Sequence, residues 1–552
     1  MNTRKYLQGE SSQGYKFFGA HKRKEGDYIF RILAPQAKNV YLAGDFNSWE
    51  KEPARKYSTG VFSIRNDKAK ENDRYCYYIE DKDSNEVQKL DPFGAQVDPS
   101  LSYSIIADTA YKYTYKKPKL DNLNIFQVNL ASYLDSYNKE IDIIKEGQKL
   151  ISYVKENNFT HIELMPIVQT RLLDSLGYRP INLISLDNSL ALVKEFKEFI
   201  DLCHKNKLGI IFDFDLSEFD DFYQGLRDFD GTRLYESDYD DIRYNYFSGM
   251  NFDYSKNLVK SYVLSSLEYW IKEYNIDLVK FSNLEKLIYW QGDLSRGINK
   301  NSYNFIKVLN KKIHDLRIKS IGSSNASKNI IDKELGFDYI EDKSISKLIK
   351  VFQKEPFYRN NYRKTIEDLI REDMDGKILG MTYIDSVLEA CSPAMKMYGD
   401  NEKYDQYKTL ISLIYTLKSN KIIFSGQEIG DLQKWEVGIT KKEKLNSNEK
   451  DFAKFFKSLT SLYTKTKALS HKDSQIKILD IEGYSVFAYK RSYKNEEFLI
   501  LLNLTDIDYS IDLGKTYWII LDSKKPQGKK SQYQFIEHAK LSKFSSMILK
   551  KK

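Results

Sequence analysis

The sequence is poor in the residues that build disulfide frameworks and metal centres. Its 552 residues include only three cysteines, Cys76, Cys203 and Cys391, which lie far apart and in no metal-ligand spacing. Its six histidines are scattered, and His161 and His204 fall inside strand and helix patterns typical of core or surface positions. We therefore predict no disulfide, no metal site and no cofactor, and a reducing compartment.

Long apolar runs are also missing. Residues 1–30 contain no apolar stretch long enough for the core of a signal peptide. Nowhere does the chain show the run of about 18 apolar residues that a membrane-spanning helix needs. We expect a soluble cytoplasmic protein that makes no use of a membrane.

No charge of one sign is concentrated in a stripe or tail. The 86 Lys+Arg exceed the 78 Asp+Glu only slightly, and the excess is spread along the chain, which argues against a nucleic-acid partner. A glycine-rich phosphate loop and a serine-hydrolase elbow are both absent. The 42 tyrosines accompany abundant Lys, Asn and Ile, a composition that indicates an AT-rich genome rather than a sugar-stacking surface.

The length exceeds what one hydrophobic core usually supports, and the pattern along the chain changes twice. From about Asp27 to Tyr113, short alternating runs such as YIFRILAP and RYCYYIED predict a small antiparallel β-sandwich. From about Asp473, the runs SVFAYKR, EEFLILLNLT and TYWIILD predict a closing all-β domain.

Between these two blocks, apolar strands alternate with amphipathic helices. The eight strand candidates are NIFQVNL, THIELMP, GIIFDFDL, IDLVKF, IKSIGS, GFDYIE, ILGMTYI and KIIFSGQ. Eight strands alternating with helices predict an α/β fold, a (β/α)₈ TIM barrel. The predicted organisation is an N-terminal lead (1–20), a β-sandwich module (21–118), the barrel (119–468) and a C-terminal β-domain (469–552).

The chain resembles a known family over most of its length. The segment RILAPQAKNVYLAGDFNSW, followed by GVFSI and KLDPFGAQ, resembles the N-terminal carbohydrate-binding-type module of glycogen branching enzymes, which implies that residues 21–118 form such a module. In the barrel, NIFQVNLASY, FTHIELMPI, DGTRLYE, LGFDY and FSGQEIG stand where that family has similar strings. Order and spacing hold from about residue 28 to 505, so the chain is similar to 1,4-α-glucan branching enzymes of the α-amylase superfamily.

The resemblance implies a retaining transglycosylation, which needs two carboxyl groups about 5–5.5 Å apart at the carboxyl ends of barrel strands. The family's fourth strand reads His-Ile-Asp-Gly-Leu-Arg-Val-Asp and ends on the nucleophile. Here Ser282 takes the place of the nucleophile and Lys280 that of the arginine. A serine hydroxyl with no adjacent base is a poor nucleophile toward a sugar carbon. The first catalytic role is therefore predicted to be empty.

Two further catalytic positions of the family are also changed. At the fifth strand, Ser323 stands where the family has its general acid/base glutamate, within the string Gly322–Ala326. At the seventh strand, Ile384 replaces the aspartate that orients the substrate, although a one-residue slip would bring Asp385 into register. The resemblance therefore implies a protein whose catalytic carboxylates are lost.

Three positions are candidate sugar contacts by the same resemblance. Tyr178 matches the tyrosine that stacks on the sugar at the cleavage point, and Asp213 matches the aspartate of the third strand. Trp49 lies in the turn Gly44–Trp49, where similar modules stack a glucan ring, although packing at a corner of the sandwich is slightly favoured for it. Packing under the barrel rim explains Tyr178 as well as a sugar contact does. Glu218 stands where the family has a sugar-binding histidine.

Three interpretations follow. The favoured one is an inactive branching-enzyme-like protein that binds α-glucan, or an active enzyme of glycogen metabolism, as a scaffold or regulator. The second is an active branching enzyme that uses relocated carboxylates, and the third is a barrel recruited to an unrelated partner. The carboxylates nearest in sequence to the vacated positions are Asp215, Glu218, Asp277, Glu285 and Asp385.

Overall fold

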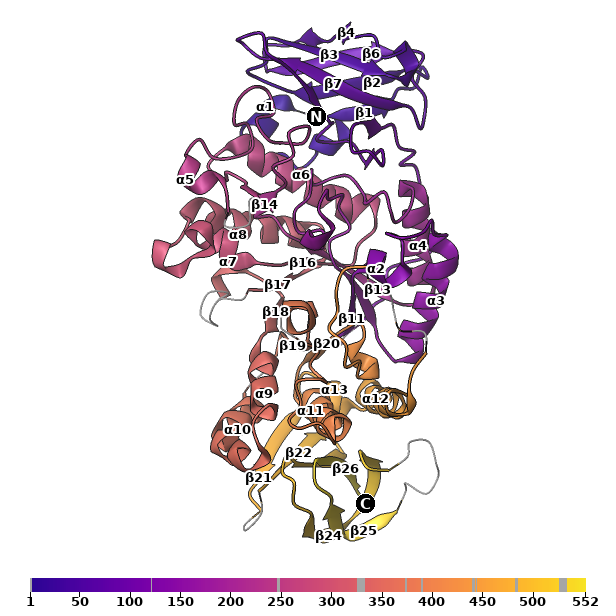
Figure 1. The fold of residues 1–552 in the computed structure, drawn as a ribbon, viewed down its shortest axis with the longest axis vertical. Helices are drawn as coiled ribbons and strands as arrows, with labels where there is room; N and C mark the ends of the chain where they lie inside the picture. The colour runs from indigo at the N-terminus through magenta and orange to yellow at the C-terminus, as the bar shows by residue number, and fades with distance from the viewer. Residues whose placement is uncertain are drawn as a thin grey trace. The chain divides into compact units, whose positions relative to one another are not determined.

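The fold is that of a computed structural model, shown in Figure 1. The structure describes residues 2–120, 122–245, 249–324, 333–372, 375–388, 391–438, 442, 444–481, 485–525 and 534–552. The chain forms two compact units. The first unit contains residues 1–118, 129–149 and 164–338, and the second contains residues 119–128, 150–163 and 339–552.

The N-terminal part of the first unit is the predicted β-sandwich. Helix α1 (Thr3–Leu7) and turn η1 (Gly14–Lys16) precede it. One sheet has the strand order β1-β2-β6-β5, and the other has the order β4-β3-β7-β10-β9, with β8 on β7. The strands are β1 (Gly19–Lys22), β2 (Tyr28–Leu33), β3 (Asn39–Gly44), β4 (Glu52–Pro53), β5 (Arg55–Lys56), β6 (Val61–Asn66), β7 (Arg74–Glu80), β8 (Glu86–Lys89), β9 (Gln96–Val97) and β10 (Ser104–Ile105), and turn η2 (Asp45–Asn47) follows β3.

All eight barrel strands predicted from the sequence are present, and their pairing closes into a barrel. Parallel strands covered by helices are buried on both faces, which explains why their sequences are continuously apolar rather than alternating. The strands are β11 (Asn124–Val128), β12 (His161–Leu164), β13 (Gly209–Phe214), β16 (Leu278–Phe281), β17 (Lys319–Gly322), β18 (Tyr339–Asp342), β19 (Lys377–Met381) and β20 (Asn420–Phe424). The predicted α/β barrel with its flanking β-domains is therefore confirmed.

Helices and short turns fill the connections of the barrel. In the first unit they are α2 (Leu130–Leu134), η3 (Leu173–Ser175), α4 (Val193–Lys205), the hairpin β14 (Glu218–Phe219) and β15 (Met250–Asn251), α5 (Asp240–Arg243), α6 (Asn257–Glu273), α7 (Leu284–Ile288), η4 (Trp290–Gly292), η5 (Leu294–Arg296), α8 (Lys300–Asp315) and η6 (Lys333–Leu335); α3 (Ile143–Glu156) begins there and ends in the second unit. In the second unit they are α9 (Ser344–Phe352), η7 (Pro356–Tyr362), α10 (Arg363–Arg371), η8 (Ile384–Leu388), α11 (Lys403–Thr416), η9 (Gln427–Ile429), α12 (Ser447–Lys465) and α13 (Lys467–Ser470).

One glycine permits the close packing of β19 and β20. A Cβ atom on Gly380 would lie 1.7 Å from the carbonyl oxygen of Ile422, a separation that no side chain allows. The two strands pair in parallel at this point, with Gly380 beside Ile422. Glycine is therefore required here by the approach of the neighbouring backbone.

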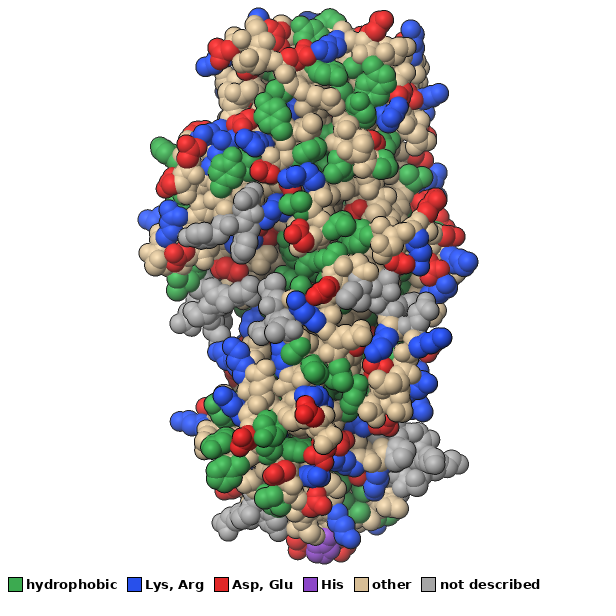
Figure 2. All heavy atoms as spheres, in the orientation of Figure 1, with side chains coloured by type: hydrophobic (Ala, Val, Ile, Leu, Met, Phe, Trp, Pro, Cys, Tyr) green, Lys and Arg blue, Asp and Glu red, His purple; other side chains and the backbone are tan. Residues whose placement is uncertain are grey.

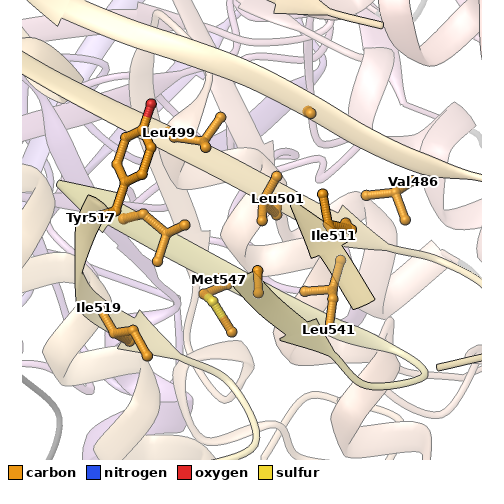
Figure 3. Close-up of a cluster of buried hydrophobic side chains, with 11 residues drawn as sticks. Val486, Leu499, Leu501, Ile511, Tyr517, Ile519, Leu541 and Met547 are labelled. Carbon is orange, nitrogen blue, oxygen red and sulfur yellow. The ribbon is translucent and has the colours of Figure 1, made fainter. Parts of the chain in front are cut away.

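The C-terminal sheet has the strand order β21-β22-β23-β26-β24-β25. Its strands are β21 (Gln475–Leu479), β22 (Val486–Tyr493), β23 (Glu496–Asn503), β24 (Tyr509–Asp522), β25 (Phe535–Leu541) and β26 (Ser545–Lys551). Figure 3 shows its core, in which aliphatic side chains from neighbouring strands, among them Val486, Leu499 and Met547, form one cluster. The three predicted domain boundaries, at 20/21, 118/119 and 468/469, stay predictions.

Two buried arginines tie this sheet to the helices of the second unit. Arg359 donates hydrogen bonds to the carbonyls of Phe352 and Leu504, at 2.9 Å each, and to the side chain of Gln406. Arg491 on β22 donates to the carbonyl of Thr416 at the end of α11 and to that of Leu469 in α13, the latter at 3.2 Å. Burial lowers the pKa of each guanidinium to about 10, so both remain cations at neutral pH.

In the first unit, Lys89 joins the sandwich to the barrel. It ends β8 and is fully buried, and its ammonium donates to the carbonyls of Tyr223 and Arg227. Burial lowers the pKa of Lys89 to about 7. Between about pH 7 and pH 10 the folded chain therefore holds fewer protons at this site than the unfolded chain does.

Because of this difference, the contribution of Lys89 to the free energy of unfolding is expected to rise with pH. From pH 7 to pH 9, wild type should gain about 2 kcal/mol relative to Lys89→Met. Urea unfolding of both proteins at pH 7, 8 and 9 measures this, with the exposed Lys82→Met as control. If the difference in the free energy of unfolding between wild type and Lys89→Met stays constant with pH, the lowered pKa of Lys89 is contradicted.

Candidate functional site

The carboxyl end of β13 holds a buried aspartate between a tyrosine and a lysine. Asp213 is fully buried and accepts a hydrogen bond of 2.7 Å from the hydroxyl of Tyr178. The ammonium of Lys280, on the neighbouring strand β16, lies 3.8 Å from the same carboxylate oxygen, Oδ2. The strands pair with Asp213 beside Lys280. We call Tyr178, Asp213 and Lys280 the Asp213 group.

The backbone before Tyr178 explains its position. Gly177 has a φ of +86°, and a Cβ atom there would lie 2.4 Å from the carbonyl oxygen of Pro166. Only glycine fits this turn, which directs the next side chain toward β13. The Tyr178 side chain is buried, so its contact with Asp213 and its packing account for its position in this structure.

Ser282 follows the last residue of β16 on the same face as Lys280, because side chains alternate along a strand. It is 3% exposed, and its hydroxyl has no hydrogen-bond partner among the described residues. No base is therefore placed to activate this hydroxyl, and a neutral hydroxyl does not stabilise an oxocarbenium-like transition state.

Ser323 lies directly after β17 and is held by its backbone. Its N–H donates to the carbonyl of Phe281 at 2.9 Å, and its carbonyl accepts from the N–H of Leu284 at 3.1 Å. The neighbouring Ser324 donates its hydroxyl to the carboxylate of Glu285 at 2.9 Å. The remaining two residues of the string compared with the family, Asn325 and Ala326, lie outside the described residues.

Two other carboxylates lie beyond the end of β13. Asp215 is buried; its Oδ1 accepts from the N–H and hydroxyl of Ser217, at 2.8 and 2.5 Å, and its Oδ2 accepts from Asn283 at 2.8 Å. Burial raises the pKa of Asp215 to about 6. The Lys286 ammonium opposes this rise, and the negative charge of Glu218 adds to it. Both oxygens of the Asp215 carboxylate are thus hydrogen-bonded by neighbouring residues of the protein.

Glu218, the first residue of β14, is similarly occupied. It accepts from Lys286 through Oε1 and from Asn245 through Oε2, and the Arg179 guanidinium lies 3.8 Å from Oε2. A Cβ atom on Gly249 would overlap this carboxylate, so glycine makes room for it. The carboxylate that replaces the family's histidine is therefore part of an ion-pair network.

Asp277 and His204 lie away from these groups. Asp277 precedes β16 and therefore stands at the amino end of that strand, opposite to Ser282. It accepts a hydrogen bond of 2.7 Å from the N–H of Ile210 and pairs with His204 at 2.9 Å. Asp277 thus orders the bottom of the barrel in the first unit, and His204 is a buried partner, as its helix pattern indicated.

In the second unit, the residues after β19 form a separate polar group. Asp385 is buried and accepts from the hydroxyl of Ser346 at 2.6 Å and from the N–H of Thr382 at 2.9 Å. Burial raises the pKa of the Asp385 carboxyl. Ile384, half-buried beside it, begins η8 and has no polar side-chain atom. Asp385 therefore caps its own turn.

A second buried acid of this unit was not predicted from the sequence. Glu428 in η9 accepts hydrogen bonds from the hydroxyl of Tyr153, at 2.6 Å, and from the N–H of Gly426, at 2.8 Å. Burial raises the pKa of Glu428 to about 7. Its only signal in the sequence is the string FSGQEIG, which the family shares.

On the sandwich, Trp49 is half-buried and lies among polar and aromatic side chains. Its ring centroid is 4.3 Å from that of Tyr103, and the Arg74 guanidinium lies 5.6 Å from the indole centroid. Arg74 also forms a salt bridge with Asp45 at 3.0 Å, and this contact lowers the pKa of that carboxyl. The Trp49 side chain thus packs against its neighbours and stays partly exposed to solvent.

Some kinds of site are not found among the described residues. In those ranges, no group of three or more His, Cys, Asp or Glu side chains is arranged to hold a metal ion. Every helix within them is too short or too polar to cross a bilayer. The three cysteines are unpaired.

Comparison with known proteins agrees with this architecture. Residues 17–94 match carbohydrate-binding module 48, the isoamylase N-terminal domain. The chain is 28% identical to a 1,4-α-glucan branching enzyme of Fusobacterium nucleatum over 99% of its own length and 98% of the relative's, and 27% identical to that of Lactobacillus acidophilus over 94% and 88%. Over nearly its whole length, the chain is therefore similar to glycogen branching enzymes.

A solved structure supports the fold at lower identity. The pullulanase of Anoxybacillus sp. LM18-11, crystallised with maltotetraose, superposes with a TM-score of 0.76 at 14% identity, covering 100% of this chain and 90% of that one. By the resemblance to branching enzymes, Ser282, Ser323 and Ile384 stand at the three strand ends where those enzymes have carboxylates. That these substitutions abolish catalysis stays a prediction.

Proposed function

We propose that this protein is a branching-enzyme-like α-glucan-binding protein that does not catalyse branching, and that it serves in the cytoplasm as a scaffold or regulator for an active enzyme of glycogen metabolism. The observation that carries the proposal is the environment of Ser282. Its buried hydroxyl has no hydrogen-bond partner among the described residues, so the nucleophile position offers neither a carboxylate nor a base.

The Asp213 group supports the same conclusion. In a working site of this kind, carboxylates must be available to the sugar. Here the Asp213 carboxylate receives the Tyr178 hydroxyl at 2.7 Å and lies 3.8 Å from the Lys280 ammonium, so its charge is balanced inside the protein. Asp213 is therefore proposed to hold the barrel strands together.

The alternative of relocated carboxylates depends on Asp215 and Glu218. The pKa of about 6 at Asp215 would suit a general acid. However, both oxygens of Asp215 accept hydrogen bonds from neighbouring side chains, and both oxygens of Glu218 lie against donors or cations. These contacts favour a structural ion-pair network over a catalytic pair.

The glucan-binding half of the proposal is supported by the module at residues 17–94 and by the partial exposure of Trp49. Native electrophoresis in gels with and without glycogen tests it. Glycogen is expected to slow wild type, and Trp49→Ala is expected to weaken this retention several-fold, the effect of about 1 kcal/mol that one lost aromatic contact produces.

The control is Tyr57→Ala, which removes an exposed aromatic ring of the same module that lies beside Arg55. It should behave as wild type. If wild type migrates equally in both gels, the glucan-binding proposal fails and recruitment of the barrel to an unrelated partner is favoured. The activity half is tested by a branching assay on amylose, in which no product is expected.

A further inference from the structure

Two aromatic side chains stand exposed on a turn of the second unit. Phe357 and Tyr358 lie in η7, between α9 and α10 (Figure 1), and hydrophobic side chains reach the surface over these helices (Figure 2). Phe357 is 83% exposed and Tyr358 50%. Burying a phenylalanine is worth about 1.5–3 kcal/mol, so the fold gives up most of that gain at Phe357.

The turn that carries these rings is held firmly from below. Pro356 begins η7 and is buried, which fixes the backbone immediately before Phe357. Arg359, immediately after Tyr358, is 2% exposed, and its guanidinium donates to the carbonyls of Lys354, Phe352 and Leu504 and to the side chain of Gln406. The buried Pro356 and Arg359 flank the two exposed rings, so both rings are held on a rigid turn.

The arrangement of the rings suits a curved polar ligand. Their centroids are 5.5 Å apart and their planes are inclined by 80°, so one ring offers a face and the other an edge. The residues that precede and follow them in the chain include exposed amide and charged side chains, namely Lys354, Glu355, Asn360 and Asn361. Apolar faces flanked by hydrogen-bonding groups match the C–H faces and hydroxyl rims of sugar rings.

The size of the surface argues against a folded protein as the ligand. An aromatic side chain contributes roughly 150–250 Å², so the exposed parts of these two rings amount to roughly 200–300 Å². A specific protein interface needs about 800 Å² on each partner. A sugar chain needs far less.

We propose that Phe357 and Tyr358 form a second α-glucan-binding site, separate from both Trp49 and the strand ends of the barrel. This inference rests on the proposed glucan-binding function and adds a surface to it. The ligand class is an α-1,4-linked glucan chain, and the two aromatic rings are its platform.

The test is native electrophoresis in gels containing amylopectin, with maltoheptaose as soluble competitor. Phe357→Ala/Tyr358→Ala is expected to raise the apparent Kd for amylopectin about tenfold, whereas Phe357→Trp should retain wild-type affinity because it keeps an aromatic face. Combining the double substitution with Trp49→Ala should remove most of the remaining retention. Tyr239→Ala, which removes a ring that is 70% exposed in the first unit, is the matched control.

The outcomes separate the two proposals. If wild type and Phe357→Ala/Tyr358→Ala are retained equally while Trp49→Ala is not, the second site is wrong and the proposed function stands. If wild type is not retained at all, both fail. Thermal unfolding of each variant confirms that it folds, which the exposure of both side chains leads us to expect. If Phe357→Trp loses as much retention as Phe357→Ala/Tyr358→Ala, the proposed role of the aromatic rings is also wrong.

Discussion

Incubation of amylose with the purified protein is expected to yield no α-1,6 branches above a heat-inactivated control. The resemblance places Ser282 and Ser323 where branching enzymes have their two catalytic carboxylates, and members of such a cooperating set act as a unit. Losing them typically lowers the rate on the order of 10⁶-fold. Iodine staining and chain-length analysis after debranching measure the product.

The variant Ser282→Asp/Ser323→Glu tests the cause of this inactivity. It is expected to form branches measurably faster than wild type, because it returns a nucleophile and a general acid to neighbouring strand ends. The control Ser282→Asp/Ser324→Glu places the second carboxylate one residue away, where Ser324 contacts Glu285, and should gain nothing. Branches formed by wild type itself would disprove the proposal and require a relocated carboxylate pair.

Asp213→Ala is expected to lower the free energy of unfolding by about 3–5 kcal/mol. The substitution removes the carboxylate that lies 3.8 Å from the Lys280 ammonium, and Lys280 is only 1% exposed. A buried ammonium that loses this carboxylate retains most of its desolvation cost. Urea unfolding followed by circular dichroism measures the loss.

A double-mutant cycle separates this pairing from simple loss of volume. Asp213→Ala/Lys280→Met should be more stable than the sum of the two single effects predicts, because it removes the ion and its partner together. Tyr178→Phe, which removes only the hydroxyl that bonds Asp213, should cost about 1 kcal/mol. Additive effects of Asp213→Ala and Lys280→Met would contradict the assigned pairing.

The barrel could be predicted from the sequence because most residues of its strands are buried. Continuous apolar runs such as GIIFDFDL and KIIFSGQ are recognisable without any knowledge of their neighbours, and both form strands, β13 and β20. The C-terminal strands β21, β25 and β26 were not predicted. β21 has no buried residue and β25 has two, and in both strands polar residues interrupt the apolar ones. β26 is buried over its first five residues, but only three of these are apolar. An uninterrupted apolar run, rather than burial alone, thus decided what could be predicted.

The sequence pattern could not predict which residues contact one another in the candidate site. Lys286 and Glu218 lie 68 positions apart, and no local period relates them. Their pairing depends on the turn after β13 meeting the helix after β16, which only the folded barrel produces. The resemblance indicated which carboxylates are missing, whereas the structure shows how the remaining ones are occupied.

The arginines that join the second unit also determine how the chain can be divided. Arg359 donates to the carbonyl of Leu504 and Arg491 to that of Thr416, so each side of the predicted boundary at 468/469 completes a buried cation of the other. A fragment that stops at residue 468 would leave Arg359 without the carbonyl of Leu504, and the carbonyl of Thr416 without the guanidinium of Arg491. The barrel end and the C-terminal sheet are therefore expected to unfold in one cooperative transition, although the chain passes from one to the other only once.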